Sequence, residues 1–291
     1  MSRPRWDVEG RDWPNRAHSR FVEVGRMRFH VQIMGDGPVL LLLHGTGAAT
    51  HSWRALAPLL AEQATVVAPD LPGHGFTTGR PAGGMGIVAM VRAIGELLHV
   101  LEIRPQAIAG HSAGAAIAIR MALDSVADPA AIVGLNAALL PFPGLAAALF
   151  PTLARLLFVN PFAPHILSRL MRTPGETARF LERSTGSRID RQGISFYERL
   201  FATSDHCAGA IGMMADWDLD ALKRDLPRLR TPLLLVHGEA DTAIPLATVR
   251  GAAAMVRGAE LQTLPRLGHL AHEEQPAETA LIIRNFLEAS L

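Results

Sequence analysis

The clearest chemical signal in this sequence is a serine between two glycines, in the run GHSAG at residues 110–114. A short apolar run, 107–109, precedes it and an alanine-rich stretch with good helix propensity follows, which predicts a strand, a sharp turn and a helix. A serine at the apex of such a turn has a strained backbone, which is tolerated only when the residues two before and two after it are very small. Gly110 and Gly114 meet this demand. We therefore predict that Ser112 is a nucleophile.

A serine hydroxyl is a weak nucleophile at neutral pH and needs a base, usually a histidine that a carboxylate holds in the right tautomer. Asp241 and His269 each follow a predicted strand. The carboxyl ends of parallel strands meet along one edge of a sheet, so Ser112, Asp241 and His269 can converge although they are distant in sequence. Their order along the chain, Ser then Asp then His, is also that of a known class of serine enzymes. The sequence thus predicts a Ser-His-Asp triad.

Each partner of the serine has a competitor. Glu239 is a rival acid, and Asp241 can also be interpreted as an aspartate that caps its own turn. Asn136, after the preceding strand, is uncharged and cannot replace the carboxylate. His272 is the rival base, but it lies beside two glutamates where a helix is expected to start. We expect His272 at the surface or in a supporting position.

Two backbone N–H groups are expected to stabilise an oxyanion. One belongs to Ala113, at the positive end of the following helix, and the other to the loop HGTG at 44–47, most simply to Thr46. Four further residues are candidates for the pocket: Gly45, His44, Trp53 and His111. The two histidines also fit a structural role as hydrogen-bonding loop residues, and the tryptophan equally fits the core. Asp70 and His74 are interpreted as turn residues.

The order of predicted elements indicates how these residues are positioned. Alternating segments at 21–24 and 27–33 predict a hairpin at the edge of a sheet. The continuous apolar run 39–43 is typical of a parallel strand covered on both faces, and helical patterns follow around 52–62 and over 87–100. Repeated strand–helix order implies an α/β fold with a mostly parallel, doubly wound sheet of about eight strands.

The pattern changes after the sixth predicted strand. From about 139 to 217, prolines break a series of helical pieces, which predicts a helical lid folded over Ser112. The predicted organisation is a surface arm at 1–20, a core at 21–138 and 218–291, and the lid at 139–217. Lid side chains that could face a ligand are His165, His206, Met171, Met213 and Met214, although methionines in apolar helices usually fill cores. None is expected to bind a metal.

The run 130–154 contains no charged residue. Its length alone would allow a membrane span, but three prolines and a glycine interrupt it and its beginning fits the sheet. We expect instead an apolar lid that can touch a membrane surface or accept a large apolar ligand.

Composition narrows the class of protein further. A chain of 291 residues that is 49% hydrophobic suits one large domain with an insertion. The 28 basic and 27 acidic residues nearly balance, which argues against a nucleic-acid partner. Cys207 is the single cysteine, so no intrachain disulfide and no cysteine-based metal site is expected. The first residues lack the apolar segment of a secretory signal, and we expect a cytoplasmic protein, with peripheral membrane contact left open, without metal or cofactor.

With these motifs in view, the chain resembles the α/β-hydrolase superfamily. The matching motifs are HGTG, DLPGHG, GHSAG, GEADTAIP and GHLAHEEQP, and the resemblance runs from about Phe21 to the end. The family spacing to Pro245 favours Asp241 as the acid. More narrowly, WPNRAHSRFVEVGRMRFHVQ, HGTGAATHSW and DLPGHGFT are similar to the magnesium chelatase accessory proteins of bacteriochlorophyll biosynthesis. That resemblance implies a link to protoporphyrin or magnesium-tetrapyrrole metabolism and an association with magnesium chelatase, but no known reaction.

The expected function is a serine hydrolase that cleaves an ester, or an amide or thioester, of a small apolar substrate such as a tetrapyrrole. Ser112 attacks, His269 moves the proton and Asp241 orients the histidine. An alternative of another class is a tetrapyrrole-binding or chelatase-assisting protein whose triad is idle. A carbon–carbon bond hydrolase or a cofactor-free peroxidase would use the same residues.

Overall fold

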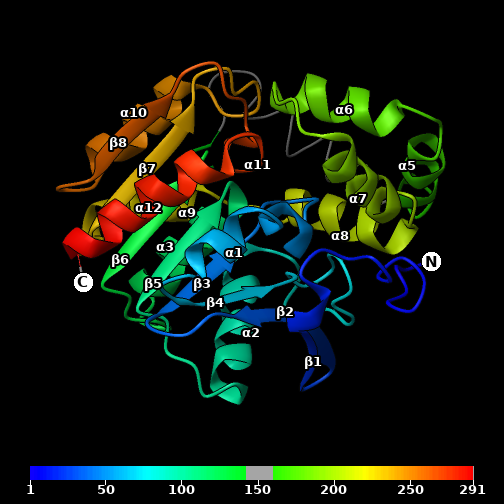
Figure 1. Cartoon of the computed structure of the whole chain (residues 1–291), viewed down its shortest axis with the longest axis horizontal. Coiled ribbons are helices and arrows are strands. Elements are labelled where there is room, and N and C mark those ends of the chain that lie inside the picture. The colour runs from blue at the N-terminus through cyan, green and yellow to red at the C-terminus, as the bar shows by residue number, and fades with distance from the viewer. Residues whose placement is uncertain (142–159, 291) are drawn as a thin grey trace.

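The computed structural model describes residues 1–141 and 160–290, and its centre is a twisted sheet (Figure 1). Within these residues the sheet has eight strands in the order β1-β2-β4-β3-β5-β6-β7-β8. The strands are β1 (Ser19–Val24), β2 (Met27–Met34), β3 (Val39–Leu43), β4 (Thr65–Pro69), β5 (Ala107–His111), β6 (Ala131–Leu135), β7 (Leu233–Gly238) and β8 (Glu260–Leu264). Strand β2 pairs antiparallel with β1 and β4, and the other pairs are parallel. The predicted hairpin and mostly parallel sheet are confirmed.

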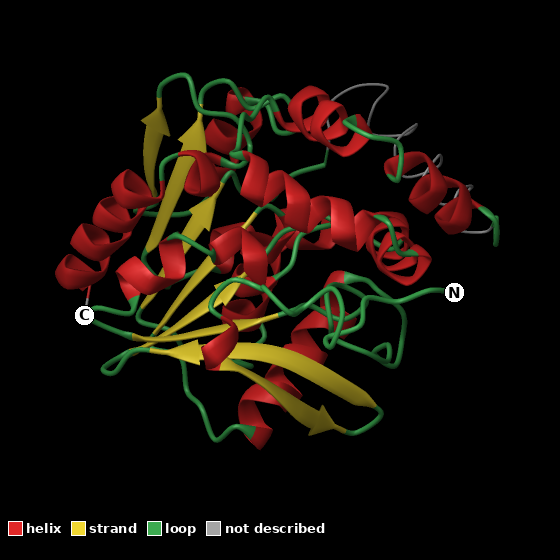
Figure 2. Cartoon of the chain, turned by 45° about the vertical axis from the view of Figure 1, so that its right-hand side comes forward, coloured by secondary structure: helices red, strands yellow, loops and turns green. Residues whose placement is uncertain are grey.

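Helices cover both faces of this sheet (Figure 2). The described α-helices are α1 (Leu56–Leu60), α2 (Ile87–Val100), α3 (Ala113–Leu123), α5 (Ala163–Met171), α6 (Glu176–Thr185), α7 (Arg191–Phe201), α8 (Ser204–Ala215), α9 (Asp220–Asp225), α10 (Leu246–Met255), α11 (Ala271–Glu274) and α12 (Pro276–Ser290). The described 3-10 helices are η1 (Arg16–His18), η2 (Thr50–Trp53) and η3 (Leu226–Arg228).

Strand β3 shows why the central strands are continuous apolar runs. Leu41 and Leu43 point into the apolar cluster that contains α2, α3 and α10, whereas Leu40 and Leu42 point into the cluster with α1 and α12. Because successive side chains of a strand alternate between faces, a strand buried on both faces needs apolar residues at every position.

One helix differs from its prediction. The pattern over 52–62 predicts a single helix, but the chain forms the 3-10 turn η2 and then the short helix α1. Pro58 has no N–H and is tolerated only in the first turn of a helix, so α1 begins at Leu56. The preceding turn is fixed from outside, since the amide of Thr50 donates to the carboxylate of Asp70 at 2.7 Å.

Helices α5 to α8, which we call the cap helices, stand apart from the layers of the sheet (Figure 1). They contact loops that follow the carboxyl ends of strands. His206 on α8 donates to the carbonyl of Gly47 after β3 and accepts from the amide of Gly75 after β4, both at 3.1 Å. The carbonyl of Thr185, the last residue of α6, accepts from the amide of His269 at 2.7 Å. Of the uncharged run 130–154, residues 142–154 lie outside the described residues.

The predicted surface arm packs against the rest of the chain. Trp13 is only 2% exposed, and its indole N–H donates to the hydroxyl of Thr50 at 2.9 Å. Arg199 on α7 forms an ion pair with Asp12. No helix within residues 1–141 and 160–290 is both long and apolar enough to cross a bilayer.

Candidate active site

Ser112 occupies a sharp turn between β5 and α3. Its backbone angles are φ 52° and ψ −115°, in a region that non-glycine residues rarely adopt. A Cβ on Gly110 would lie 2.4 Å from the amide nitrogen of Ala115, and one on Gly114 would lie 2.0 Å from the carbonyl oxygen of Leu43. Both glycines are therefore required by the packing of the turn, as the sequence pattern predicts.

The structure brings Asp241 and His269 together. Nδ1 of His269 lies 2.7 Å from Oδ2 of Asp241, and the carboxylate is fully buried. Its other oxygen accepts from the amides of Ala243 at 2.7 Å and Ile244 at 2.9 Å. Burial raises the pKa of Asp241, but the hydrogen bond and charge of His269 outweigh burial and hold that pKa below its ordinary value. The ionised carboxylate therefore keeps the proton of the imidazole on Nδ1 and leaves Nε2 available as a base.

Ser112 and His269 are not hydrogen-bonded to each other. Within the described part of the chain, neither the serine hydroxyl nor Nε2 of the histidine has a hydrogen-bond partner. Ser112 is half-buried, and the histidine side chain is 9% exposed. In structures without substrate such contacts are often long and tighten only in the complex, so this geometry is compatible with a nucleophile and its base.

Backbone donors lie beside the serine. A Cβ on Gly45 would lie 3.1 Å from Cβ of Ser112, so the loop after β3 closely approaches this serine. In the described part of the chain, neither the amide of Thr46 in this loop nor that of Ala113 donates to another residue. Ala113 is the first residue of α3, where backbone N–H groups have no partner inside the helix. These two amides can receive an oxyanion.

The competitors of the two triad partners lie elsewhere. Glu239 is exposed and accepts from the hydroxyl of Thr263 at 2.9 Å. His272 is 1% exposed, so the first of its two expected positions, at the surface, is wrong, and the supporting position remains. Its ring lies 4.5 Å from that of His111 and 4.8 Å from that of Trp53, which is itself fully buried in the core. Burial lowers the pKa of His272 well below its ordinary value, which keeps the ring neutral.

The two histidines in the motifs hold loops in place. His44 donates from Nδ1 to the carbonyl of Gly45 and accepts at Nε2 from the amide of Leu71, each at 2.8 Å. His111 donates from Nε2 to the carbonyl of His269 at 2.9 Å. Burial and the neighbouring His269 lower the pKa of His111 to about 3. Both rings are neutral and serve as structural hydrogen-bonding groups.

Asn136 is a site residue whose role the sequence did not reveal. Its side-chain amide donates to Oδ2 of Asp241 at 2.8 Å and to the carbonyl of Gly268 at 3.2 Å. It thereby links the loops after β6, β7 and β8. Its φ of 45° lies in the left-handed region, which asparagine adopts more readily than most residues. In the sequence, the only indication of this role is that the asparagine directly follows a buried strand.

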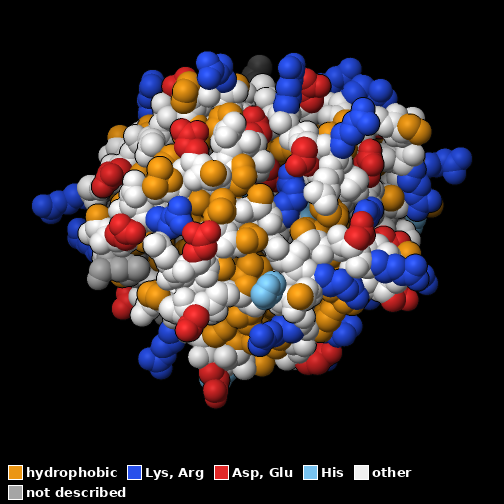
Figure 3. Space-filling model, viewed as in Figure 1, with side chains coloured by type: hydrophobic (Ala, Val, Ile, Leu, Met, Phe, Trp, Pro, Cys, Tyr) orange, Lys and Arg blue, Asp and Glu red, His pale blue; other side chains and the backbone are white. Residues whose placement is uncertain are grey.

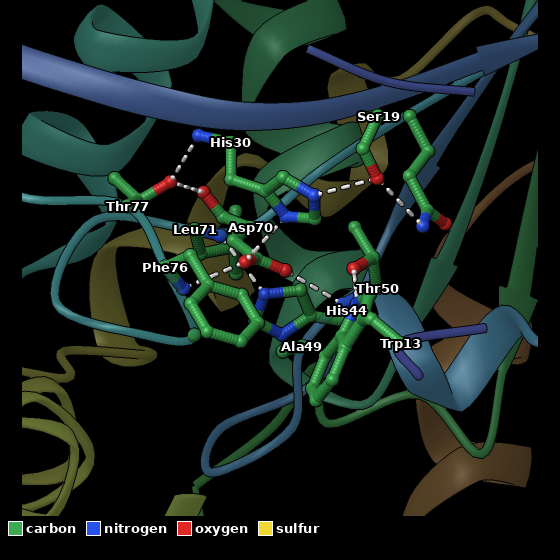
Figure 4. A network of polar contacts seen from close by, with 12 residues as sticks. Trp13, Ser19, His30, His44, Ala49, Thr50, Asp70, Leu71, Phe76 and Thr77 are labelled. Atoms are coloured by element: carbon green, nitrogen blue, oxygen red, sulfur yellow. Dashed lines mark hydrogen bonds and ion pairs between the residues drawn. The ribbon is translucent and has the colours of Figure 1, made fainter. Parts of the chain in front are cut away.

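A second polar network surrounds Asp70 (Figure 4). Its carboxylate lies 2.8 Å from Nδ1 of His30 and accepts from the amides of Thr50 at 2.7 Å and Phe76 at 2.8 Å. Nε2 of His30 lies 2.9 Å from the hydroxyl of Ser19. Burial raises the pKa of Asp70, but His30 and the backbone donors bring it below its ordinary value. Asp70 therefore joins three segments of the chain and is more than a turn residue.

The remaining candidates of the cap are mostly packed inside. His206 and Cys207 are buried, and burial raises the pKa of the Cys207 thiol to about 12, which excludes it as a nucleophile at neutral pH. Met171 and Met213 are buried too, whereas His165 is exposed. No group of three or more His, Cys, Asp or Glu residues in the described ranges is arranged to hold a metal ion.

The sheet order and the serine at the turn define a class. The Alpha/beta hydrolase family matches residues 40–280, and this chain belongs to that family.

The chain is also similar to individual proteins over most of its length. The chain is 38% identical over 279 residues to the Magnesium-chelatase 30 kDa subunit of Rhodobacter capsulatus, covering 95% of this chain and 97% of that protein. It is 31% identical to the Pyrrolizixenacetamide deacetylase of Xenorhabdus hominickii, covering 91% and 97% respectively. The solved structure of the epoxide hydrolase CorEH superposes with a TM-score of 0.79 at 23% identity, covering 93% of this chain and 98% of that one. These similarities confirm the predicted fold class and the resemblance on which it rests.

Proposed function

We propose that this α/β hydrolase cleaves an ester, or an amide or thioester, through an acyl-enzyme. Ser112 attacks the carbonyl carbon while Nε2 of His269 takes its proton, and Asp241 stabilises the imidazolium that forms. The amides of Thr46 and Ala113 hold the oxyanion. His269 then gives its proton to the leaving group. In the second half-reaction His269 removes a proton from water, which attacks the acyl carbon, and then gives that proton to Oγ of Ser112 as the bond between the acyl group and the serine breaks.

One observation carries this proposal. The hydrogen-bonded pair of His269 and Asp241 lies at the same edge of the sheet as a strained serine, beside two backbone amides that have no acceptor within the described residues. Each part has other uses in proteins, but an ionised aspartate, an imidazole with an available Nε2 and oxyanion donors around one serine form the set that acyl transfer requires. The deacetylase activity named for one relative supports the same reaction class.

The name of the other relative supports a proposal for the substrate class. The name Magnesium-chelatase 30 kDa subunit supports a role in magnesium-tetrapyrrole metabolism, with an apolar substrate such as a tetrapyrrole ester and an association with magnesium chelatase. We propose that residues 139–217 act as a lid over Ser112 that selects this substrate. The same name favours a second candidate, a protein that binds a tetrapyrrole or assists the chelatase while its triad is idle.

Labelling with a fluorophosphonate separates these two functions. The purified protein should form one covalent adduct, and peptide mapping should place that adduct on Ser112. The Ser112→Ala variant should form none, while Ser19→Ala, which removes the serine of the second network, should label like the wild type. Absence of an adduct on a folded sample would refute the hydrolase proposal. A shift in protoporphyrin absorbance that persists in Ser112→Ala would support the binding function.

A further inference from the structure

Helix α5 presents a row of large apolar side chains to solvent. Phe162, at its N-cap, is 69% exposed, Ile166 is 63% exposed and Leu170 is 50% exposed. Because an α-helix turns about 100° per residue, steps of four keep these side chains on one side. The opposite side of α5, with Pro164, Ser168 and Met171, is buried. The helix therefore has an apolar side facing inward and a second one facing outward.

The outward row is unusual for this molecule. Ten large hydrophobic side chains among the described residues are exposed, and four of them belong to the neighbouring segments of α5 and α6. The fourth is Phe180 on α6, which is 39% exposed. Exposed apolar side chains that are scattered singly are normal, whereas a contiguous group marks a surface that binds something.

The charge on α5 itself has one sign, whereas α6 carries both glutamates and arginines. Residues 160–175 contain no aspartate or glutamate but include His165, Arg169 and Arg172. The guanidinium of Arg169 has no hydrogen bond or ion pair within the described part of the chain. That of Arg172 donates to the carbonyl of Ala202. On the helical wheel these basic residues follow one flank of the apolar row. In Figure 3 basic side chains lie over the cap helices, with acidic side chains among them.

We propose that this surface, the α5 face (Phe162, Ile166, Arg169 and Leu170), docks on a membrane that contains anionic lipids. An apolar row lined by basic residues is the pattern of helices that lie in the bilayer interface. A second copy of the chain fits less well, because a twofold contact would bring the arginines of the two copies together. The negative charge of the lipid surface complements them.

Docking through this face has a consequence for the site. The cap helices contact the loops that carry Gly47 and His269. When the protein docks on the membrane through α5, the cap therefore lies between the membrane and these loops. An apolar ligand could then pass from the lipid to the cap without crossing bulk water. Membrane binding itself does not depend on the proposed hydrolysis, and the Ser112→Ala variant should bind vesicles like the wild type.

Co-sedimentation with vesicles tests the proposal on the purified full chain. Binding is expected to vesicles of phosphatidylcholine mixed with phosphatidylglycerol, and it should weaken as salt is added. Ile166→Ser combined with Leu170→Ser should lower the vesicle affinity at least about tenfold, because the two side chains lose their burial in the interface. Arg169→Gln should lower it about fivefold, and only when phosphatidylglycerol is present.

Helix α2 offers a matched control. Val88, which is 61% exposed, and Arg92, which is also exposed, lie four residues apart on that helix. Val88→Ser combined with Arg92→Gln should leave binding unchanged. All variants should keep the thermal midpoint of the wild type, since every replaced side chain is exposed.

Three results would overturn the proposal. The first is that the protein binds vesicles neither with nor without phosphatidylglycerol. The second is that the α5 and α2 variants lose equal amounts of vesicle affinity, and the third is that the α5 variants keep the affinity of the wild type. Sedimentation velocity adds a fourth: if the α5 variants turn a dimer into a monomer and vesicles are not bound, the face is a contact between copies of the chain.

Discussion

Asn136 should contribute to stability mainly by holding the charged form of Asp241. The asparagine is fully buried, and its amide donates to that carboxylate at 2.8 Å and to the carbonyl of Gly268 at 3.2 Å. Glycine is the informative replacement, because the φ of 45° at this position costs glycine nothing. Asn136→Gly therefore removes the two hydrogen bonds without adding backbone strain.

The expected loss at neutral pH is about 2–3 kcal/mol. A hydrogen bond to a charged group contributes roughly 1.5–3 kcal/mol, a bond to a neutral carbonyl about 1 kcal/mol, and water that enters the vacated space recovers part of this. Asn136→Ala should lose about 1 kcal/mol more, since the left-handed backbone is strained for alanine.

The pH dependence gives the sharper test. The folded-state pKa of Asp241 lies below its ordinary value of 3.8, so its ionised form stabilises the fold above that value, and this contribution is lost as the pH falls through the folded pKa. Asn136→Gly raises the folded pKa, because the carboxylate loses a donor. The variant should therefore lose stability at higher pH than the wild type, and the difference between the two should shrink in acid, where Asp241 is protonated in both.

Urea unfolding followed by tryptophan fluorescence, repeated from neutral to acid pH, measures this difference directly. The rate of fluorophosphonate labelling on the same samples reports whether Asp241 still orients His269, and it should fall in the variant. A stability difference that stays constant over the whole pH range would refute the reasoning, because it would mean that the amide does not act on the charged carboxylate.

Three further substitutions test the positioning of the site. Gly114→Ala should lower the free energy of unfolding in urea by about 2 kcal/mol or more, since the added Cβ would lie 2.0 Å from a backbone oxygen. The control is Gly251→Ala in α10, where the nearest contact of the added Cβ is at 3.5 Å, and it should raise the free energy of unfolding by about 0.5 kcal/mol. Tyr197→Phe removes a hydroxyl that donates to the buried Glu273 carboxylate at 2.7 Å and should cost about 1.5–3 kcal/mol; a loss below about 0.5 kcal/mol would contradict this. His206→Phe keeps a ring but loses both loop contacts, so labelling of the nucleophile should slow by more than the thermal midpoint explains.

The sequence predicts the parts of this fold in which local pattern and final environment agree. A strand covered on both faces, such as β3, must be apolar throughout, and that run is visible in the sequence. The sharp turn at Ser112 can also be predicted from the sequence, because the two glycines whose small size allows it lie within two residues of the serine. Asp241 and His269 could be expected near Ser112 because parallel strands end at one edge of the sheet.

The surroundings of the triad could not be predicted in this way, because they depend on contacts between distant segments. His272 and Glu273 look like surface residues at a helix start, yet both are buried. Glu273 is accommodated there by an ion pair with Arg54 from the core and a hydrogen bond from Tyr197 of the cap. Arg54 and Tyr197 are both far from Glu273 in sequence. The residues around Glu273 therefore do not reveal the two contacts that allow a glutamate to be buried here.

This protein has two Ser-His-Asp sets, and they differ in the features that a nucleophile requires. Ser19, His30 and Asp70 form an unbroken chain of contacts of 2.9 and 2.8 Å, whereas the set around Ser112 has only its histidine–aspartate contact. If an unbroken chain of contacts from serine to histidine to aspartate identified the nucleophile, that residue would be Ser19. However, that serine sits in the ladder between β1 and β2, and its hydroxyl also accepts from the side chain of Gln32 at 3.2 Å. At Ser112 the backbone is strained, and the loop after β3 approaches the serine closely. Stabilisation of the negative charge that develops on the substrate usually lowers the barrier to acyl transfer more than any other single effect. The amides of Thr46 and Ala113, more than a contact between the serine and a histidine, therefore support the proposal that Ser112 is the reactive residue.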